Sequence, residues 1–362
     1  MKERQPTAES IKRVVVRGTN WVGDAVMTIP ALRELRRVLP HAHITLATRS
    51  WARGLFSDAD FIDDLLVYDR GARDLRAVVR QMRQWRRQRF DLAVLFQNAF
   101  EAALIAAGAR VPVRLGYAGE GRRHLLTHPL AVPPWKEERH EVFYYLNLIS
   151  ELERLLYGAS SVESRAPVFA LAVSDARQAQ ARATLLAHGA GAGRSLVALC
   201  PGSINSRAKR WPPARYAALA DRFIEETGAS VALIGSVDEM DVALEVCALM
   251  RHRPVMLAGR TDLAQAVAVL SVADLLVTND TGPAHIAAAL DCPTLVIFGP
   301  TNPTTTRPFP SAAEIIRRPP DCAPCMLRDC PIDHRCMTAI STDEVFARSS
   351  AIRKRQHAGV WT

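Results

Sequence analysis

The segment 273–303 holds two strand-like apolar runs separated by a helix of small residues, and this alternation constrains the fold more than any other feature. The first run covers 275–277 and stops before Asp280. A helix rich in alanine follows, and a second buried-strand pattern covers 294–298. Strand, helix and strand in this order predict a parallel α/β sheet, in which the loops after the strands form the ligand-binding edge.

Asp280, Thr281 and Gly282 mark the start of the helix between these two strands. Free backbone N–H groups and the positive end of the helix dipole favour a phosphate there, and a glycine permits close approach of the backbone. Asp280 has a simpler alternative role, because aspartate is a common N-cap residue. A second candidate anion site upstream favours the ligand-binding interpretation.

That second site follows the predicted strand 195–199. Ser203 lies in the loop after the strand, and Lys209 lies shortly before the predicted helix 214–226. Two such loops in one half of the chain suggest a nucleotide diphosphate as the ligand. Glu239 follows the predicted strand 230–234, where a carboxylate either accepts hydrogen bonds from ribose hydroxyls or acts as a first-turn helix charge.

The N-terminal half begins with a similar unit: a predicted strand over 11–17, a loop with Gly18 and Gly23, and a predicted helix over 25–39. The loop lacks both the third glycine of a dinucleotide fingerprint and a Walker lysine. It does carry a carboxylate, Asp24. Two roles are open for Asp24: a favourable charge near a helix N-terminus, or a base presented to a bound hydroxyl.

The domain organisation follows from the length and from one connecting segment. With 362 residues the chain accommodates two domains of ordinary size, and strand-like runs alternate with helical patterns in both halves. The small and polar segment 158–167 is typical of a linker. We expect an N-terminal domain over 1–165 and a C-terminal domain over 166–340, each a doubly wound parallel sheet. The tail 341–362 is either a returning helix or a loose segment.

The charge of the chain indicates an anionic partner. The net charge is +9, and residues 1–172 carry 26 Lys and Arg against 19 Asp and Glu. Nucleic acid and a phosphorylated lipid are the candidate partners. Nucleic acid is disfavoured, because the sequence shows no RNA-binding sheet signature, helix-turn-helix or zinc-finger spacing. The polar N-terminus and the lack of an apolar run of roughly 18 residues predict a soluble or peripheral protein that is not secreted.

Two arginine-rich segments are candidates for contact with an anionic partner. The predicted helix 74–89 presents either a solvated basic face or a surface for an anionic membrane. Its apolar stripe is Leu75, Val78, Val79, Met82 and Trp85, and its basic row is Arg73, Arg76, Arg80, Arg83 and Arg87. Further along, four arginines surround the glycine-rich segment 116–121: Arg110, Arg114, Arg122 and Arg123. They suit bidentate contacts to phosphate or carboxylate groups, with generic surface basicity as the alternative.

Four cysteines crowd one stretch near the C-terminus: Cys322, Cys325, Cys330 and Cys336, with His334 among them. The spacing resembles that of a metal site, but the second C-x-x-C pair of a typical zinc site is missing. Bound metal and a loop of reduced thiols are both open.

Four segments carry a resemblance to a known family: GTNWVGDAVMTIPALRELRR, PGSINSRAKRWPPARYAALA, VTNDTGPAHIAAALDCPTLVIFGPTNP and the tail CAPCMLRDCPIDHRCMTAI. The first three resemble the family-9 glycosyltransferases, specifically the ADP-heptose:lipopolysaccharide heptosyltransferases. The tail resembles the cysteine-bearing end of the type II members. Together these segments span nearly the whole chain in matching order.

The resemblance implies a GT-B fold, in which two Rossmann-like domains face a cleft and bind the acceptor (N-terminal) and the nucleotide sugar (C-terminal). It also implies inverting transfer that requires no metal or cofactor, with ADP-heptose as a substrate. Asp24 becomes the general base and Lys209 a ligand of the diphosphate. The remaining donor-binding residues are Ser203, Glu239, Asp280, Thr281, Gly282 and His285. The acceptor is then an anionic heptosylated Kdo-lipid A core, bound through Arg110, Arg114, Arg122 and Arg123.

On this interpretation the enzyme is cytoplasmic, and the helix 74–89 holds it at the inner leaflet of the cytoplasmic membrane. Another family-9 transferase, of heptosyltransferase type I or III or with a different sugar acceptor, is the nearest alternative. A GT-B nucleotide-sugar epimerase and a non-catalytic anion-binding protein are the alternatives from other classes.

Overall fold

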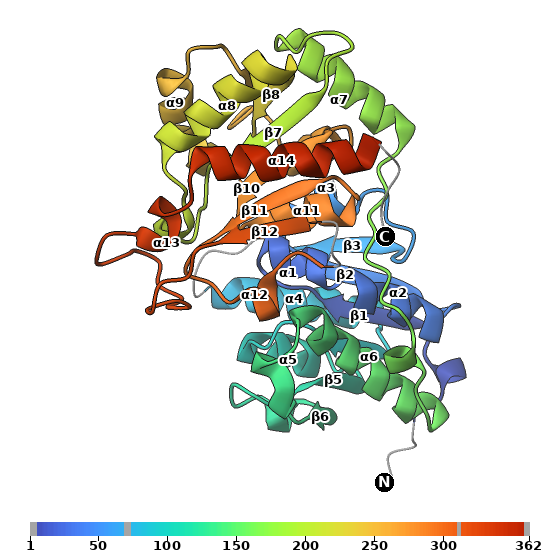
Figure 1. The fold of residues 1–362 in the computed structure, drawn as a ribbon. Coiled ribbons are helices and arrows are strands. Elements are labelled where there is room, and N and C mark those ends of the chain that lie inside the picture. The colour runs from blue at the N-terminus through green and yellow to red at the C-terminus, as the bar shows by residue number, and fades with distance from the viewer. Residues whose placement is uncertain (1–5, 69–73, 310–312, 358–362) are drawn as a thin grey trace. The chain divides into compact units, whose positions relative to one another are not determined.

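The structure is a computed structural model that describes residues 6–68, 74–309 and 313–357 (Figure 1). The chain divides into two compact units, Met1–Phe169 and Ala170–Thr362, each built around its own sheet. Within the described ranges, no helix has the length and apolar character needed to cross a membrane.

The first unit contains a six-stranded sheet in the order β3-β2-β1-β4-β5-β6, with every neighbouring pair parallel. Its strands are β1 (Arg13–Arg17), β2 (His43–Thr48), β3 (Asp64–Val67), β4 (Leu92–Leu95), β5 (Val113–Tyr117) and β6 (His128–Leu130). The strand order reverses between β1 and β4. In open α/β sheets a ligand binds beyond the carboxyl ends of the two strands at such a point.

Within the described residues of this unit, six α-helices and four short 3₁₀ turns flank these strands. They are α1 (Val22–Met27), α2 (Ile29–Val38), α3 (Ala52–Phe56), α4 (Leu75–Gln88), α5 (Phe100–Gly108), α6 (Glu141–Tyr157), η1 (Ala8–Ser10), η2 (Arg123–Leu125), η3 (Pro134–Glu137) and η4 (Val162–Ser164). All four residues of β4 are buried, as expected for a parallel strand covered on both faces.

Two predictions for this unit were wrong in detail. The single helix predicted over 25–39 is two helices, α1 and α2, which meet at Thr28. Thr28 donates its hydroxyl to the Ala25 carbonyl at 2.6 Å, and Pro30 has no N–H with which to continue the hydrogen bonding of α1. Neither β5 nor β6 was predicted, and the segment 116–121 that was expected to be a glycine-rich loop begins inside β5.

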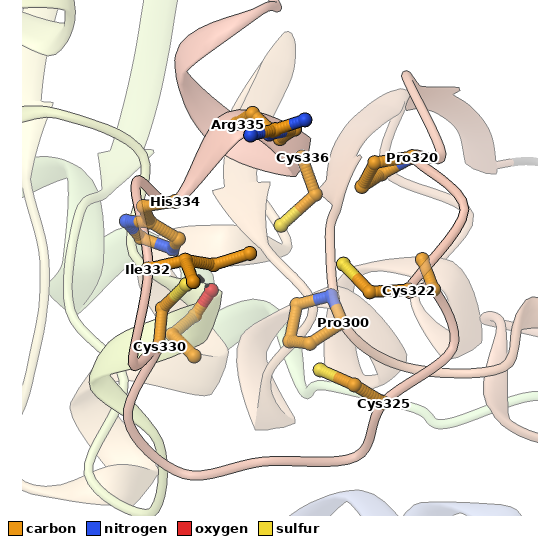
Figure 2. Close-up of a pocket in the computed structure, with 11 residues that line it drawn as sticks. Pro300, Pro320, Cys322, Cys325, Cys330, Ile332, His334, Arg335 and Cys336 are labelled. Atoms are coloured by element: carbon orange, nitrogen blue, oxygen red, sulfur yellow. Dashed lines mark hydrogen bonds between the residues drawn. The ribbon is translucent and has the colours of Figure 1, made fainter.

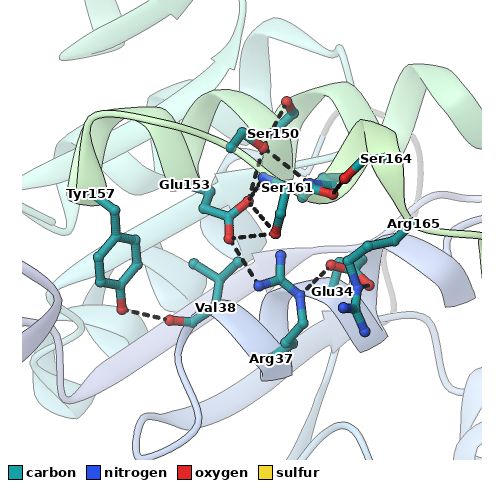
Figure 3. Close-up of polar contacts among 11 residues, drawn as sticks. Glu34, Arg37, Val38, Ser150, Glu153, Tyr157, Ser161, Ser164 and Arg165 are labelled. Atoms are coloured by element: carbon teal, nitrogen blue, oxygen red, sulfur yellow. Dashed lines mark hydrogen bonds and ion pairs between the residues drawn. The ribbon is translucent and has the colours of Figure 1, made fainter.

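A polar cluster joins α2 to α6 and to the end of the first unit (Figure 3). Arg37 donates to Glu34 at 2.5 Å and to Glu153 at 2.8 Å. Glu153 also accepts from the Ser160 hydroxyl and the Ser161 backbone, both at 2.8 Å. Burial acts to raise the pKa of Glu153, but the hydrogen bonds from Arg37, Ser161 and Ser160 outweigh it and lower that pKa to about 2. The ionised Glu153 therefore fastens the segment that leads out of the unit.

The second unit repeats the same connectivity. Its sheet has the order β12-β11-β10-β7-β8-β9, again with every neighbouring pair parallel. Its strands are β7 (Leu196–Cys200), β8 (Ser230–Leu233), β9 (Val255–Met256), β10 (Leu275–Asn279), β11 (Thr294–Phe298) and β12 (Ala313–Arg317). The strand order reverses between β7 and β10, the strands that precede the two predicted anion sites.

The helices and turns of the second unit alternate with its strands, as the α/β pattern predicts. They are α7 (Asp175–Ala187), η5 (Arg207–Lys209), α8 (Pro213–Thr227), η6 (Val237–Glu239), α9 (Met240–Leu249), α10 (Leu263–Leu270), α11 (Gly282–Ala289), α12 (Pro303–Thr306), α13 (Arg335–Thr338) and α14 (Thr342–His357). The tail helix α14 packs on α8, with the rings of Phe346 and Phe223 5.0 Å apart. The edge strand β12 was not predicted. The two sheets confirm the predicted fold of two doubly wound parallel sheets.

Candidate functional site

Asn279, at the carboxyl end of β10, ties together the loops at the point where the strand order of the second sheet reverses. Its side chain is fully buried. Its amide nitrogen donates to the carbonyls of Pro201 and Gly202 at 2.8 and 3.1 Å. Its oxygen accepts from the Trp211 backbone and the Tyr216 hydroxyl, both at 3.1 Å. The loop after β7, the segment before α8 and the end of β10 are therefore fixed to one another.

Asp280 follows Asn279 and forms a buried ion pair. Its carboxylate, 4% exposed, accepts from the Lys209 ammonium at 2.9 Å and from the Thr301 hydroxyl at 2.7 Å. Lys209 also donates to the Asp280 carbonyl at 3.1 Å. The N-cap of α11 is Thr281, and Asp280 does not cap the helix. The N-cap alternative for Asp280 is therefore wrong, and its carboxylate instead holds the lysine that the sequence assigned to a diphosphate.

The first turn of α11 follows Asp280 in the chain, after the N-cap Thr281. Gly282 and Pro283 occupy its first positions, and a helix N-terminus in general favours a negative charge. His285 lies in the following turn and is buried. The residues after β10 and the first turns of α11 thus carry Asp280, Thr281, Gly282 and His285 at the switch point.

Glu239 and Gly202 bring the loop after β8 against the loop after β7. Glu239 is buried, and its carboxylate accepts from the backbone and the hydroxyl of Ser236, each at 2.9 Å. A Cβ atom on Gly202 would lie 2.3 Å from a Glu239 carboxylate oxygen, so only glycine permits this approach. Ser203, next in the chain, is buried, and its carbonyl accepts from the Arg210 guanidinium at 3.1 Å. Glu239 therefore accepts hydrogen bonds within its own turn and at the same time lies beside the loop after β7.

Asp24 lies in the first turn of α1, beyond the carboxyl end of β1, and is half-buried. The N-terminal end of α6 packs near it and contributes Glu141, a carboxylate that the sequence did not single out. Burial raises the pKa of Glu141 to about 7; Lys136 opposes this, while Asp24 and Glu137 reinforce it. Asp24 therefore has a second carboxyl group beside it that titrates near neutral pH.

The four candidate acceptor arginines differ in what they contact. Arg122 is fully buried, and its guanidinium donates to the Tyr117 carbonyl and the Asn98 side chain, both at 2.7 Å, and to the Gln97 carbonyl. Burial lowers the pKa of Arg122 to about 10. Arg114 donates to the Leu125 carbonyl at 2.7 Å. Arg110 and Arg123 are exposed. In this structure, then, Arg122 and Arg114 fix the loop that follows β5, and Arg110 and Arg123 are accessible to a ligand.

The cysteines of the second unit are all reduced, and no group of three or more His, Cys, Asp or Glu within the described ranges could hold a metal ion. Cys322, Cys325, Cys330 and Cys336 line a small cavity together with His334 (Figure 2).

Comparison with known proteins places the chain in a family. The sequence pattern of glycosyltransferase family 9 (heptosyltransferase) matches residues 78–335. The chain belongs to glycosyltransferase family 9. It is 31% identical over 319 residues to lipopolysaccharide heptosyltransferase 2 of Salmonella typhimurium strain LT2, an alignment that covers 84% of this chain and 88% of the relative.

Two further relatives support the same assignment. Lipooligosaccharide heptosyltransferase 2 of Haemophilus ducreyi is 31% identical over 316 residues, with the same coverage of 84% and 88%. The solved structure of Escherichia coli ADP-heptose lipopolysaccharide heptosyltransferase II is 27% identical, covers 95% of this chain and 99% of its own, and superposes with a TM-score of 0.80. This family-9 glycosyltransferase thus has the GT-B fold, and its family confirms a transferase over the epimerase and anion-binding alternatives.

Sequence reasoning missed Asn279, Thr301 and Glu141 as members of the two sites. Asn279 stands inside the quoted motif VTNDTG, so its position after a buried strand was the signal that pointed to it. Thr301 follows β11 at the same edge of the sheet. Glu141 opens a helix more than a hundred residues from Asp24, and no local pattern relates the two.

Replacing Asn279 with aspartate is expected to destabilise the second unit by about 3–5 kcal/mol, because a negatively charged oxygen would replace the amide nitrogen that donates to the Pro201 and Gly202 carbonyls. Chemical denaturation of the purified chain measures this. The matched control is Asn302→Asp at the N-cap of α12, where Asn302 accepts from the Thr304 backbone at 3.0 Å and aspartate caps equally well. Equal stabilities of the two variants would contradict the role assigned to Asn279.

Proposed function

We propose that this family-9 glycosyltransferase transfers heptose from ADP-L-glycero-β-D-manno-heptose to the heptosylated Kdo-lipid A inner core of lipopolysaccharide. The observation that carries the proposal is the likeness to lipopolysaccharide heptosyltransferase 2 across 84% of the chain. The solved relative whose title names ADP-heptose, at 27% identity, supports the choice of donor.

The donor site in this proposal is the cluster around Lys209 and Asp280. The diphosphate binds at the first turn of α11, where Thr281 and Gly282 offer backbone N–H groups and Lys209 adds a positive charge. As the bond between the anomeric carbon and the phosphate breaks, these groups stabilise the charge that develops on ADP, so the transfer does not require a metal ion. Asp280 positions Lys209. Ser203 after β7, Glu239 after β8 and His285 in α11 hold the ribose and heptose.

The base in this proposal is Asp24. Its carboxylate takes the proton of the acceptor hydroxyl while the hydroxyl oxygen forms a bond to the anomeric carbon of the heptose. The bond from that carbon to the ADP oxygen breaks at the same time, and ADP leaves with the electron pair. Attack from the face opposite ADP inverts the anomeric configuration, so a β-linked donor gives an α-linked product.

The acceptor in this proposal lies on the first unit, where the exposed Arg110 and Arg123 are available to its phosphates and carboxylates. Arg114 and Arg122 contribute indirectly, because their hydrogen bonds order the loop after β5.

The helix α4 provides a membrane-facing surface in this proposal. Arg76, Arg80, Arg83, Arg86 and Arg87 are exposed on it, and so are Leu75 (78%) and Val79 (42%). The opposite face is packed into the core through Val78 and Trp85, so the predicted apolar stripe divides between the two faces; Arg73 lies outside the described residues. Exposed apolar side chains among arginines suit an anionic bilayer surface, here the inner leaflet, for an enzyme that remains cytoplasmic.

The variant Arg83→Gln/Arg86→Gln/Arg87→Gln is expected to bind anionic phosphatidylglycerol vesicles about 100-fold more weakly than the wild type, because each arginine near such a surface contributes about 1 kcal/mol. Sedimentation with vesicles measures the partition. The control is Arg182→Gln/Arg194→Gln/Arg253→Gln, which removes the same charge from exposed positions of the second unit. If both triple variants lose binding equally, net charge and not α4 accounts for it.

The chemistry of the transfer is tested on the product. With purified chain, the β-linked ADP-heptose and the heptosylated acceptor, we expect the mass of one added heptose and an α-linkage by NMR. A β-linked product would contradict the inverting mechanism. Activity confined to a different nucleotide sugar would assign the chain to the nearest alternative, another family-9 transferase.

A further inference from the structure

The cysteine-bearing loop 320–336 packs against the segment that carries Lys209. Ala208, the residue before Lys209, is held on both sides: its N–H donates to the Arg328 carbonyl at 2.9 Å, and its carbonyl accepts from His334 Nε2 at 2.5 Å. Ser206 donates its hydroxyl to the Leu327 carbonyl at 3.1 Å. The short turn η5 that presents Lys209 therefore takes its position from the loop.

The same loop also holds the segment that carries Thr301. The Met326 N–H donates to the Pro300 carbonyl at 3.0 Å, and Thr301 is the next residue. At Gly299 a Cβ atom would lie 2.5 Å from Met337 Sδ and 3.3 Å from Cys336 Sγ, so the backbone before Pro300 is packed closely against the end of the loop. Both partners of the Asp280 carboxylate, Lys209 and Thr301, thus follow residues that the loop binds.

The inside of the loop is lined mainly by thiol and apolar side chains. The four cysteines, with Ala208 and Pro300, line a cavity of about 20 Å³, the size of one water molecule (Figure 2). Burial raises the pKa of the Cys336 thiol, and Cys330, Cys325 and Cys322 raise it further. The neutral form of the Cys336 thiol is therefore favoured, and the four cysteines lie between the loop and the two segments that it holds.

We propose that the loop 320–336 is a positioning element of the donor site, which sets the affinity for the nucleoside diphosphate by fixing Ala208 and Pro300 and thereby Lys209 and Thr301. This proposal rests on the proposed function and deepens it, since the loop contacts no reacting group itself. Ser206 and His334 are its positioning residues.

The test removes the two side-chain contacts without touching Lys209. Ser206→Ala deletes the hydroxyl donor. His334→Asn shortens the side chain so that it no longer reaches Ala208, while asparagine tolerates the left-handed backbone at this position, where φ is 57°. We expect the double variant to bind ADP about 10-fold more weakly by calorimetry, since two hydrogen bonds of ordinary strength are lost. The KM for ADP-heptose should rise in parallel while the acceptor KM stays unchanged.

The matched control is Asp329→Asn. Asp329 forms an ion pair with Arg207 at 2.7 Å, which spans the same two segments, but both side chains are more than half exposed. Exposed pairs contribute little, so ADP affinity should not change. Ser206→Thr, which keeps the hydroxyl, should restore the affinity lost in Ser206→Ala. The proposal would be overturned if the acceptor KM of the double variant rose as much as its KM for ADP-heptose. It would also be overturned if the double variant bound ADP as tightly as the wild type.

A measurement on the wild type avoids any folding defect of the variants. If the loop contacts strengthen ADP binding, then bound ADP must stabilise the loop contacts by the same free energy. ADP should therefore slow hydrogen exchange at the Ala208 and Met326 amides. If ADP binds but leaves exchange at both amides unchanged, the positioning role is overturned. The proposed function is not affected by that result. A wild type that does not bind ADP would instead overturn the proposed function.

Discussion

The variant Asp24→Asn is expected to lower kcat by about 10²–10⁴-fold while ADP affinity stays at the wild-type level, because asparagine keeps the shape of the side chain but cannot take up a proton. Asp24 is half-buried in the first turn of α1, at the carboxyl end of the strand next to the reversal of strand order. Initial-rate assays of ADP release measure kcat, and calorimetric titration with ADP measures the affinity.

If Asp24 is only a favourable charge at the helix N-terminus, the same substitution should give a different result. First-turn acidic residues contribute about 0.3–1 kcal/mol to stability and nothing to a chemical step. Asp175→Asn, in the first turn of α7 and exposed, is the matched control and should leave kcat unchanged. If Asp24→Asn behaves like Asp175→Asn, with full turnover and slightly reduced stability, Asp24 is not the base.

The variant Lys209→Met is expected to lower kcat by about 10²–10³-fold, the effect of removing one group that stabilises developing negative charge. It also leaves the Asp280 carboxylate, which is 4% exposed, with the Thr301 hydroxyl as its remaining described partner. A loss of stability is therefore expected too, since an uncompensated buried charge costs about 3–5 kcal/mol. The measured loss of activity thus mixes a structural effect with a catalytic one.

The double variant Lys209→Met/Asp280→Asn separates the two effects. The asparagine removes the unpaired charge and still accepts from Thr301, so thermal unfolding should return close to the wild-type temperature. Turnover should stay at the level of Lys209→Met, because the charge that faces the diphosphate is still missing. Recovery of turnover together with stability would show that Lys209 serves only to pair with Asp280.

The central strands of both sheets could be predicted because each is a short apolar run followed by a loop and a helix. β11 (Thr294–Phe298) was predicted with its observed bounds. The strands that escaped prediction are edge or near-edge strands: β6 has three residues, β5 is interrupted by Arg114 and Gly116, and β12 is interrupted by Glu314. Such strands are defined by pairing with a neighbour more than by their own composition.

The candidate site was predictable in its residue types but not in its contacts. Lys209 and Asp280 were singled out separately, and their ion pair became visible only once the order β10-β7 placed their loops side by side. The same strand order brings Asn279 to Pro201 and Gly202 across more than seventy residues. Arg122 was assigned to the acceptor because arginine on a glycine-rich segment suits anions. Its burial depends on carbonyl acceptors at the end of β5 and in the segment after β4, which no local pattern reveals.

The measurement that tests the central proposal most directly is ADP release by the purified chain with ADP-L-glycero-β-D-manno-heptose and either Kdo2-lipid A or its monoheptosylated form. We predict turnover with the monoheptosylated acceptor alone, lost in Asp24→Asn. Turnover with the unheptosylated acceptor would contradict the proposed acceptor and indicate a heptosyltransferase of type I. No ADP release with either acceptor would contradict the proposed function as a whole.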